Sequence, residues 1–153
     1  MRYRILGVTE ARASENGAEV ALGGGRLRAV LAVLALRVGR PVPPETLIEA
    51  VWAGDPPTDA AGALQALMSR LRRSLGRDAI VSEPGGYRLD TPRESVDLFE
   101  FERLAREGEA ALAADDPATA AEALTSALAL WRGPALADLP GRASAAARPE
   151  ALR

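Results

Sequence analysis

The sequence contains no cysteine, no histidine and no lysine. The absence of cysteine and histidine excludes thiol nucleophiles, histidine general bases and nearly all zinc sites. Without lysine there is neither a P-loop lysine nor a Schiff-base amine, and all 19 positive charges are arginine. Because the remaining residues form no recognisable catalytic set, we expect a protein that is not an enzyme and holds no metal ion or cofactor.

Long apolar runs are also missing. No run approaches the roughly 18 residues that a membrane span requires, because Arg26, Arg28, Arg37 and Arg40 bracket the most apolar stretch. Met1 is followed by a strand-like segment and not by a basic and then apolar signal. We therefore expect a cytoplasmic protein that does not enter a membrane.

The 153 residues are sufficient for one medium domain or two small ones with a buried core. The formal net charge of −2 is unevenly distributed: residues 1–95 contain 13 arginines and 11 acidic residues, whereas residues 96–153 contain 6 and 10. A basic face in the first part is compatible with binding to nucleic acid, since the face and not the sum determines the contact.

Residues 1–92 show strand-like patterns followed by three helix-like patterns and a hairpin. Pro44 suits the first position of the second helix, and Thr58 or Asp59 can cap the third, which ends before Gly76. The predicted strands are 3–8 and 19–22, the predicted helices are 26–38, 44–52 and 60–75, and the hairpin pairs 79–82 with 87–90 around a Pro-Gly-Gly turn.

The third predicted helix is strongly amphipathic. At 100° per residue its large apolar residues fall within about 60° of Leu64 and should form a buried stripe. These residues are Leu64, Leu67, Met68, Leu71 and Leu75. The opposite side carries Ser69, Arg70, Arg73 and Arg77, flanked by Gln65 and Arg72.

That polar face is suited to the major groove of DNA. Arginine can donate two hydrogen bonds to guanine, glutamine can pair with adenine, and further arginines can bind phosphates. The alternative is a solvated helix face whose arginines complement the helix dipole. The helix considered alone does not separate the two interpretations.

The order of elements favours DNA. Two helices, an arginine-faced third helix and a short hairpin form the arrangement of a winged helix-turn-helix. Arg88 in the hairpin lies beside Gly85-Gly86 and could reach the minor groove or phosphates, although it equally suits an ordinary strand arginine. We expect Tyr87 to join the core and tie the wing to the helices.

Residues 93–153 are predicted to be all helical. Helices of about 96–114 and 118–131 are separated by Asp115-Asp116-Pro117, and their small residues partly fit a tetratricopeptide-type hairpin. Residues 142–153 look like the entry to a further helix interrupted by Pro149, so we expect either a piece of a longer protein or a short natural form. The predicted domains are 1–92 and 93–153.

Five segments resemble the Streptomyces antibiotic regulatory protein family, in the family's order and spacing. Residues 22–34, 46–52, 69–76 and 85–89 resemble its OmpR-type winged helix, and residues 127–136 resemble the start of its bacterial transcriptional activation domain. The fold implied is an N-terminal antiparallel sheet, three helices and a C-terminal wing, followed by a tetratricopeptide-like helical hairpin.

The resemblance also implies function. It places Arg70 at a base-contacting position, Arg72 and Arg73 at backbone or base-edge positions, and Arg88 at the wing arginine. It implies a transcriptional activator that binds direct repeats in double-stranded DNA as a homodimer and recruits RNA polymerase holoenzyme at secondary-metabolite gene clusters. No receiver domain precedes Met1, so control by phosphorylation is not expected.

Two other functions are compatible with parts of the sequence. A phosphate-binding loop at Gly23–Gly25 is disfavoured, because Arg28 stands where the third glycine would be and no parallel βαβ pattern follows. The second alternative is a protein-interaction module whose winged helix no longer binds DNA specifically. It predicts that the arginine face is dispensable.

Overall fold

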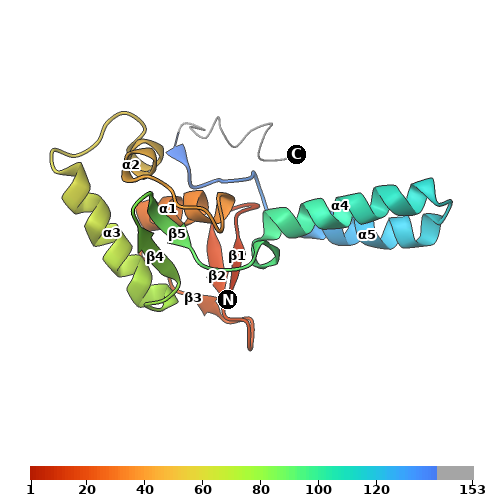
Figure 1. Ribbon diagram of the computed structural model, residues 1–153. Coiled ribbons are helices and arrows are strands. Elements are labelled where there is room, and N and C mark those ends of the chain that lie inside the picture. The colour runs from red at the N-terminus through yellow and green to blue at the C-terminus, as the bar shows by residue number, and fades with distance from the viewer. Residues whose placement is uncertain (141–153) are drawn as a thin grey trace.

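The computed structural model describes residues 1–140 as an α+β winged helix followed by a helical hairpin (Figure 1). The predicted helix entry at residues 142–153 lies outside the described residues. The first sheet contains β1 (Arg2–Arg4), β2 (Glu10–Arg12) and β3 (Glu19–Val20), all antiparallel and in this order. The helices α1 (Gly25–Leu36), α2 (Pro44–Trp52) and α3 (Ala60–Leu75) follow. The wing comprises β4 (Ile80–Glu83) and β5 (Gly86–Leu89).

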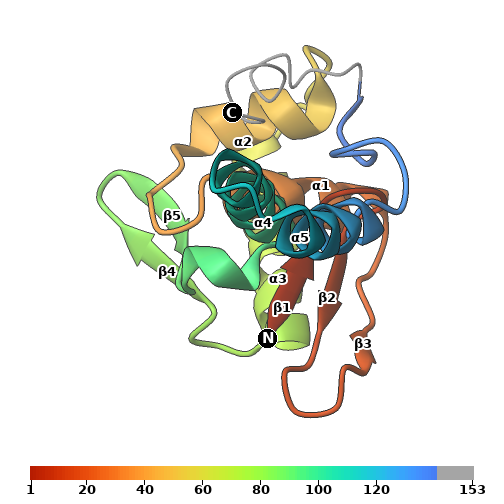
Figure 2. The ribbon, with the colours of Figure 1, turned by 90° about the vertical axis from the view of Figure 1, so that its right-hand side faces the viewer.

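A short 3-10 turn, η1 (Arg93–Ser95), leads from the wing into the helical hairpin of α4 (Asp97–Ala113) and α5 (Pro117–Ala129). The hairpin projects from the body of the molecule on the side away from α3, as the two orthogonal views show (Figures 1 and 2). Asp116 caps α5 by accepting a hydrogen bond from the Thr119 amide, and Pro117 occupies the first turn. The predicted helices and wing hairpin are therefore confirmed to within a few residues.

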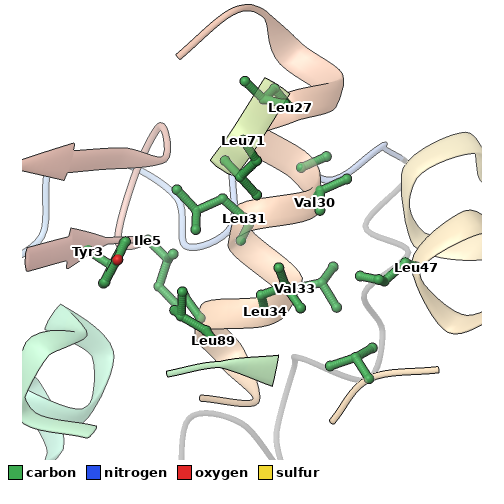
Figure 3. Packing of buried hydrophobic residues seen from close by; sticks show 14 of the residues in the cluster. Tyr3, Ile5, Leu27, Val30, Leu31, Val33, Leu34, Leu47, Leu71 and Leu89 are labelled. Atoms are coloured by element: carbon green, nitrogen blue, oxygen red, sulfur yellow. The ribbon is translucent and has the colours of Figure 1, made fainter. Parts of the chain in front are cut away.

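The hydrophobic core is built around α1. Because this helix is apolar on almost every side, it is buried between the first sheet, α2, α3 and the wing (Figure 3). Leu31 and Leu34 are fully buried, as are Leu71 of α3 and Leu89 of β5. This packing fixes the relative positions of α3 and the wing, which are the two elements expected to meet DNA.

The predictions for the first sheet were partly wrong. The strand expected at 3–8 pairs only as Arg2–Arg4, the strand expected at 19–22 contains two residues, and β2 was not predicted. A three-residue strand with one buried side chain, Ala11, carries too little alternation to be recognised. Residues 5–7 do not pair as a strand because their backbone groups bind segments that are distant in sequence.

Those distant segments join the winged helix to the helical hairpin. The carbonyl oxygens of Leu6 and Ile5 accept hydrogen bonds from the amides of Arg132 and Leu136, at 2.9 and 2.8 Å. Asp138 accepts from the Thr9 amide at 2.6 Å and forms an ion pair with Arg28 at 3.0 Å. The segment that follows α5 therefore returns to the first sheet and to α1.

Asp97, at the start of α4, completes this junction. Its carboxylate is buried and accepts hydrogen bonds from the amides of Ile5 (2.7 Å) and Leu6 (3.2 Å). Burial raises the pKa of the Asp97 carboxyl, while the two amide bonds oppose that rise. Its two oxygen atoms thus satisfy backbone donors that would otherwise be unpaired inside the protein.

Replacing Asp97 by alanine should lower the free energy of unfolding by about 2–4 kcal/mol, because two buried amides lose their acceptor. Urea denaturation followed by circular dichroism measures this change. Glu94→Ala is the matched control, since this neighbouring carboxyl is exposed. Equal stability of the two variants would show that water readily satisfies the freed amides.

Candidate nucleic-acid interface

Helix α3 forms and ends as its sequence predicts. The Asp59 side chain caps it by accepting a hydrogen bond from the Gly62 amide at 3.1 Å, and Gly76 ends it with a φ of 109°. The predicted stripe is buried, with every member at most 8% exposed: Leu64, Leu67, Met68, Leu71 and Leu75. The opposite face of α3 is consequently directed away from the core.

The structure places most of the predicted contact residues on that outer face. Gln65, Ser69, Arg70 and Arg73 are exposed on α3. Arg77 is also exposed, but it lies beyond the end of the helix at Leu75, so its predicted position on the helical face was wrong. The chain turns at Gly76, and Arg77 is exposed past the C-terminus of α3.

Arg70 has a partner within the protein. Its Nη2 donates a hydrogen bond of 2.7 Å to the Gly23 carbonyl oxygen, in the segment that leads into α1. A Cβ atom at position 23 would lie 2.5 Å from this nitrogen, so a larger residue would displace the arginine. Gly24, with a φ of 136°, precedes the first residue of α1, which confirms the expected turn into a helix.

Arg72 is directed to the wing. Its Nε and Nη2 donate to the Ile80 carbonyl oxygen at 3.3 and 3.2 Å, and Nη2 also donates to the Ser82 hydroxyl at 2.8 Å. The guanidinium carbon lies 5.8 Å from the centre of the Tyr87 ring, within range of a cation–π contact. Arg72 is half-buried as a result.

The wing is also attached to the segment between α1 and α2. Tyr87 and Val42 exchange two backbone hydrogen bonds, of 2.8 and 3.0 Å. At Gly86 the backbone approaches so closely that a Cβ atom would lie 2.0 Å from the Val42 carbonyl oxygen. Tyr87 is partly buried against the core, and its backbone ties the wing to the helices as expected.

Arg88 is held by two carboxylates. It forms ion pairs with Glu83 at 3.2 Å and with Asp90 at 2.9 Å, and these hydrogen bonds raise the pKa of its guanidinium, Asp90 contributing most. The three side chains together carry one negative charge. The predicted wing arginine is therefore compensated in the free protein, which the sequence pattern did not indicate.

Over residues 1–140, acidic side chains do not gather into a group that could hold a metal ion. No helix in these residues combines the length and apolar character needed to cross a membrane.

Two family models match the chain in succession. Residues 17–89 match "Transcriptional regulatory protein, C terminal", and residues 96–153 match "Bacterial transcriptional activator domain". The first match lies within the winged helix, and the second begins one residue before α4.

Named regulators of two Streptomyces species are similar over most of this chain. Regulatory protein AfsR of Streptomyces griseus is 42% identical over 142 residues, which is 92% of this chain and 14% of that protein. Transcriptional regulator RedD of Streptomyces coelicolor is 37% identical over 146 residues, or 90% of this chain and 41% of that protein. The chain thus spans less than half of either relative.

A solved structure has the same fold. The structure of Mycobacterium tuberculosis EmbR in complex with a low-affinity phosphopeptide superimposes with a TM-score of 0.83 at 35% identity, covering 90% of this chain and 38% of that one. Its similarity includes both the winged helix and the helical part. The relatives and the matched domains are those of transcriptional regulators and not of enzymes. Over most of its length the chain is thus similar to regulators of the Streptomyces antibiotic regulatory protein family, and its two parts match a transcriptional regulatory C-terminal domain and a bacterial transcriptional activator domain.

Proposed function

We propose that this chain binds double-stranded DNA in a sequence-specific manner and activates transcription. The observation that carries the proposal is the outer face of α3, where Gln65, Ser69, Arg70 and Arg73 are exposed opposite a fully buried apolar stripe. A helix held by its inner face, with bidentate hydrogen-bond donors on its outer face, suits the major groove. The adjacent wing offers a second contact to the minor groove or to phosphates.

The residues have distinct proposed roles. Arg70 and Arg73 bind guanine edges or nearby phosphates, and Gln65 binds adenine. The Ser69 hydroxyl binds the sugar-phosphate backbone of the DNA and so holds the helix in place. Arg77, past the end of the helix, binds a phosphate. To reach a base, Arg70 exchanges its hydrogen bond with the Gly23 carbonyl oxygen for one with DNA.

The charge distribution supports this orientation. Residues 96–140 contain nine acidic residues and three arginines. They form the hairpin and the segment after it, and the hairpin projects on the side away from α3 (Figure 1). An acidic hairpin in this position is kept at a distance from the phosphates, so the overall charge of −2 does not oppose binding.

The wing charge gives a direct prediction. Asp90→Asn should strengthen binding to a random-sequence duplex by about two- to threefold at low salt, because it removes one of the two ion-pair partners of Arg88 and a negative charge from the wing. Fluorescence anisotropy with a labelled duplex measures the affinity. Asp115→Asn, which removes the same charge at the turn between α4 and α5, should leave it unchanged. Identical affinities for both variants would place Arg88 out of reach of DNA.

Further proposals concern partners and organisation. In our account residues 1–92 bind DNA and residues 93–153 begin the activation domain. The cytoplasmic protein binds direct repeats at promoters of secondary-metabolite genes and recruits RNA polymerase holoenzyme.

The hairpin exposes three large apolar side chains, Leu112 (57% exposed), Leu124 (37%) and Leu128 (69%). We expect another domain or a second copy of the chain to cover them. A strictly monomeric elution at high concentration would contradict the second-copy version.

One observation favours a different function. Arg70, Arg72 and Arg88 already have partners within the protein, as expected if this face no longer binds DNA and the chain is a protein-interaction module. The two functions are separated by competition. A regulator prefers its selected duplex to a random duplex at near-physiological salt, whereas the interaction module binds neither with preference.

A further inference from the structure

Arg72 makes several contacts with the wing of the same protein. Its planar guanidinium spans two residues of β4, through the Ile80 carbonyl oxygen and the Ser82 hydroxyl, and lies over the Tyr87 ring of β5. The three contacts come from both strands of the wing. A single side chain of α3 therefore contacts both strands of the wing.

The neighbouring arginine behaves differently. Arg73 is exposed, one residue further along the same helix. Arg72 is half-buried, and its Nε and Nη2 are directed to β4 and not to solvent. Removing either side chain removes one positive charge from the same turn of α3, so the pair allows the effect of charge to be separated from that of position.

A hairpin with two four-residue strands has little stability of its own. The wing is attached to the protein body on one side through Val42, by the two backbone hydrogen bonds with Tyr87. Ile80 and Leu89 are buried in the core, and the Gly39 amide donates a hydrogen bond to the Leu89 carbonyl oxygen at 3.2 Å. Arg72 adds the polar contacts that join the wing to α3, so its loss should loosen the wing on that side.

We propose that Arg72 is a positioning residue that clamps the wing to α3, so that the helix and the wing meet DNA as one preformed surface. Only the contact with DNA rests on the proposed DNA-binding function, since Arg72 binds the wing in the free protein. In this role Arg72 does not bind a base or a phosphate. A wing that is already in position improves affinity, because it loses no conformational entropy when DNA binds.

The clamp is tested first without DNA, by hydrogen exchange of the wing amides in the 153-residue chain. Arg72→Ala should speed exchange in β4 and β5 by about tenfold, and Ser82→Ala should have a smaller effect in the same direction. Arg73→Ala should leave these amides unchanged. Equal protection in wild type, Arg72→Ala and Ser82→Ala would overturn the proposal, whether or not the chain binds DNA.

The second test measures affinity against salt, with a labelled random-sequence duplex as the probe. Arg73→Ala should reduce the slope of log affinity against log salt by about 0.9, the value for one lost phosphate contact. Arg72→Ala should weaken binding by about three- to tenfold and leave the slope unchanged. Arg72→Lys retains the charge but not the planar fork, so it should behave like alanine. A reduced slope for Arg72→Ala that lysine restores would identify a phosphate contact and overturn the proposal.

Discussion

Replacing Arg70 and Arg73 together by alanine should weaken binding to the selected duplex by about 100-fold or more. Each bidentate contact to a base contributes about 1–3 kcal/mol of discrimination, and the two side chains lie on the exposed face of α3. Binding to a random duplex should fall much less, since its affinity comes from phosphates. Preference between the two duplexes should therefore be lost. Fluorescence anisotropy with both duplexes measures the change.

The matched control is the double replacement of Arg103 and Arg106 by alanine. These arginines are exposed on α4, so the control removes the same charge from the hairpin. It should leave both affinities close to those of the wild type. If the Arg70 and Arg73 variant also kept its preference, the outer face of α3 would be dispensable and the interaction-module alternative would be favoured.

Gly86→Ala should produce the largest loss of stability, about 3–5 kcal/mol in the free energy of unfolding. The new Cβ atom would lie 2.0 Å from the Val42 carbonyl oxygen and 2.9 Å from the Pro43 Cα, and neither backbone atom can move aside easily. The φ of 134° at this position is also unfavourable for any residue with a Cβ atom. Thermal or urea denaturation measures the loss.

Gly39→Ala is the appropriate control for Gly86→Ala. Gly39 also has a positive φ, of 81°, but a Cβ atom there would meet nothing within 4 Å. Gly39→Ala should lower the free energy of unfolding only by the backbone strain, about 1–2 kcal/mol. If the two variants were equally stable, the close approach of the wing to the α1–α2 segment would not contribute to folding.

Much of this fold could be predicted from the sequence. The apolar spacing of α1, α2 and α3, the cap at Asp59 and the glycine at 76 are local signals, and the structure has each of them. The buried stripe of α3 follows from helical periodicity, so its outer face could be predicted as well. The resemblance to a known family added the order of the elements and the wing.

The partners of the polar residues could not be predicted in this way. Asp97 looks like an ordinary N-terminal helix residue, yet its carboxylate binds amides 91 and 92 residues earlier in the chain. The hydrogen bond between Arg70 and Gly23 spans 47 residues. Periodicity shows which face a residue occupies, but contacts at such separations depend on how the elements pack.

The arginine contacts qualify the interpretation of the sequence pattern. Arg72 and Arg88 belong to an arginine-rich pattern suited to DNA, but in the free protein Arg72 binds the wing and Arg88 is paired with two carboxylates. Helical spacing places Arg73 on the outer face of α3 and Arg72 at its edge, but it gives no partner for either residue. The structure distinguishes them because only one of the two faces β4.

The central claim, sequence-specific binding of double-stranded DNA, is tested most directly by selection from a random pool. The chain is mixed with random duplexes at near-physiological salt, and the bound duplexes are sequenced after several rounds. Our account predicts recovery of a short motif, repeated in direct orientation at about one helical turn when two copies bind together. Recovery of no motif above background would contradict the claim and favour an interaction module.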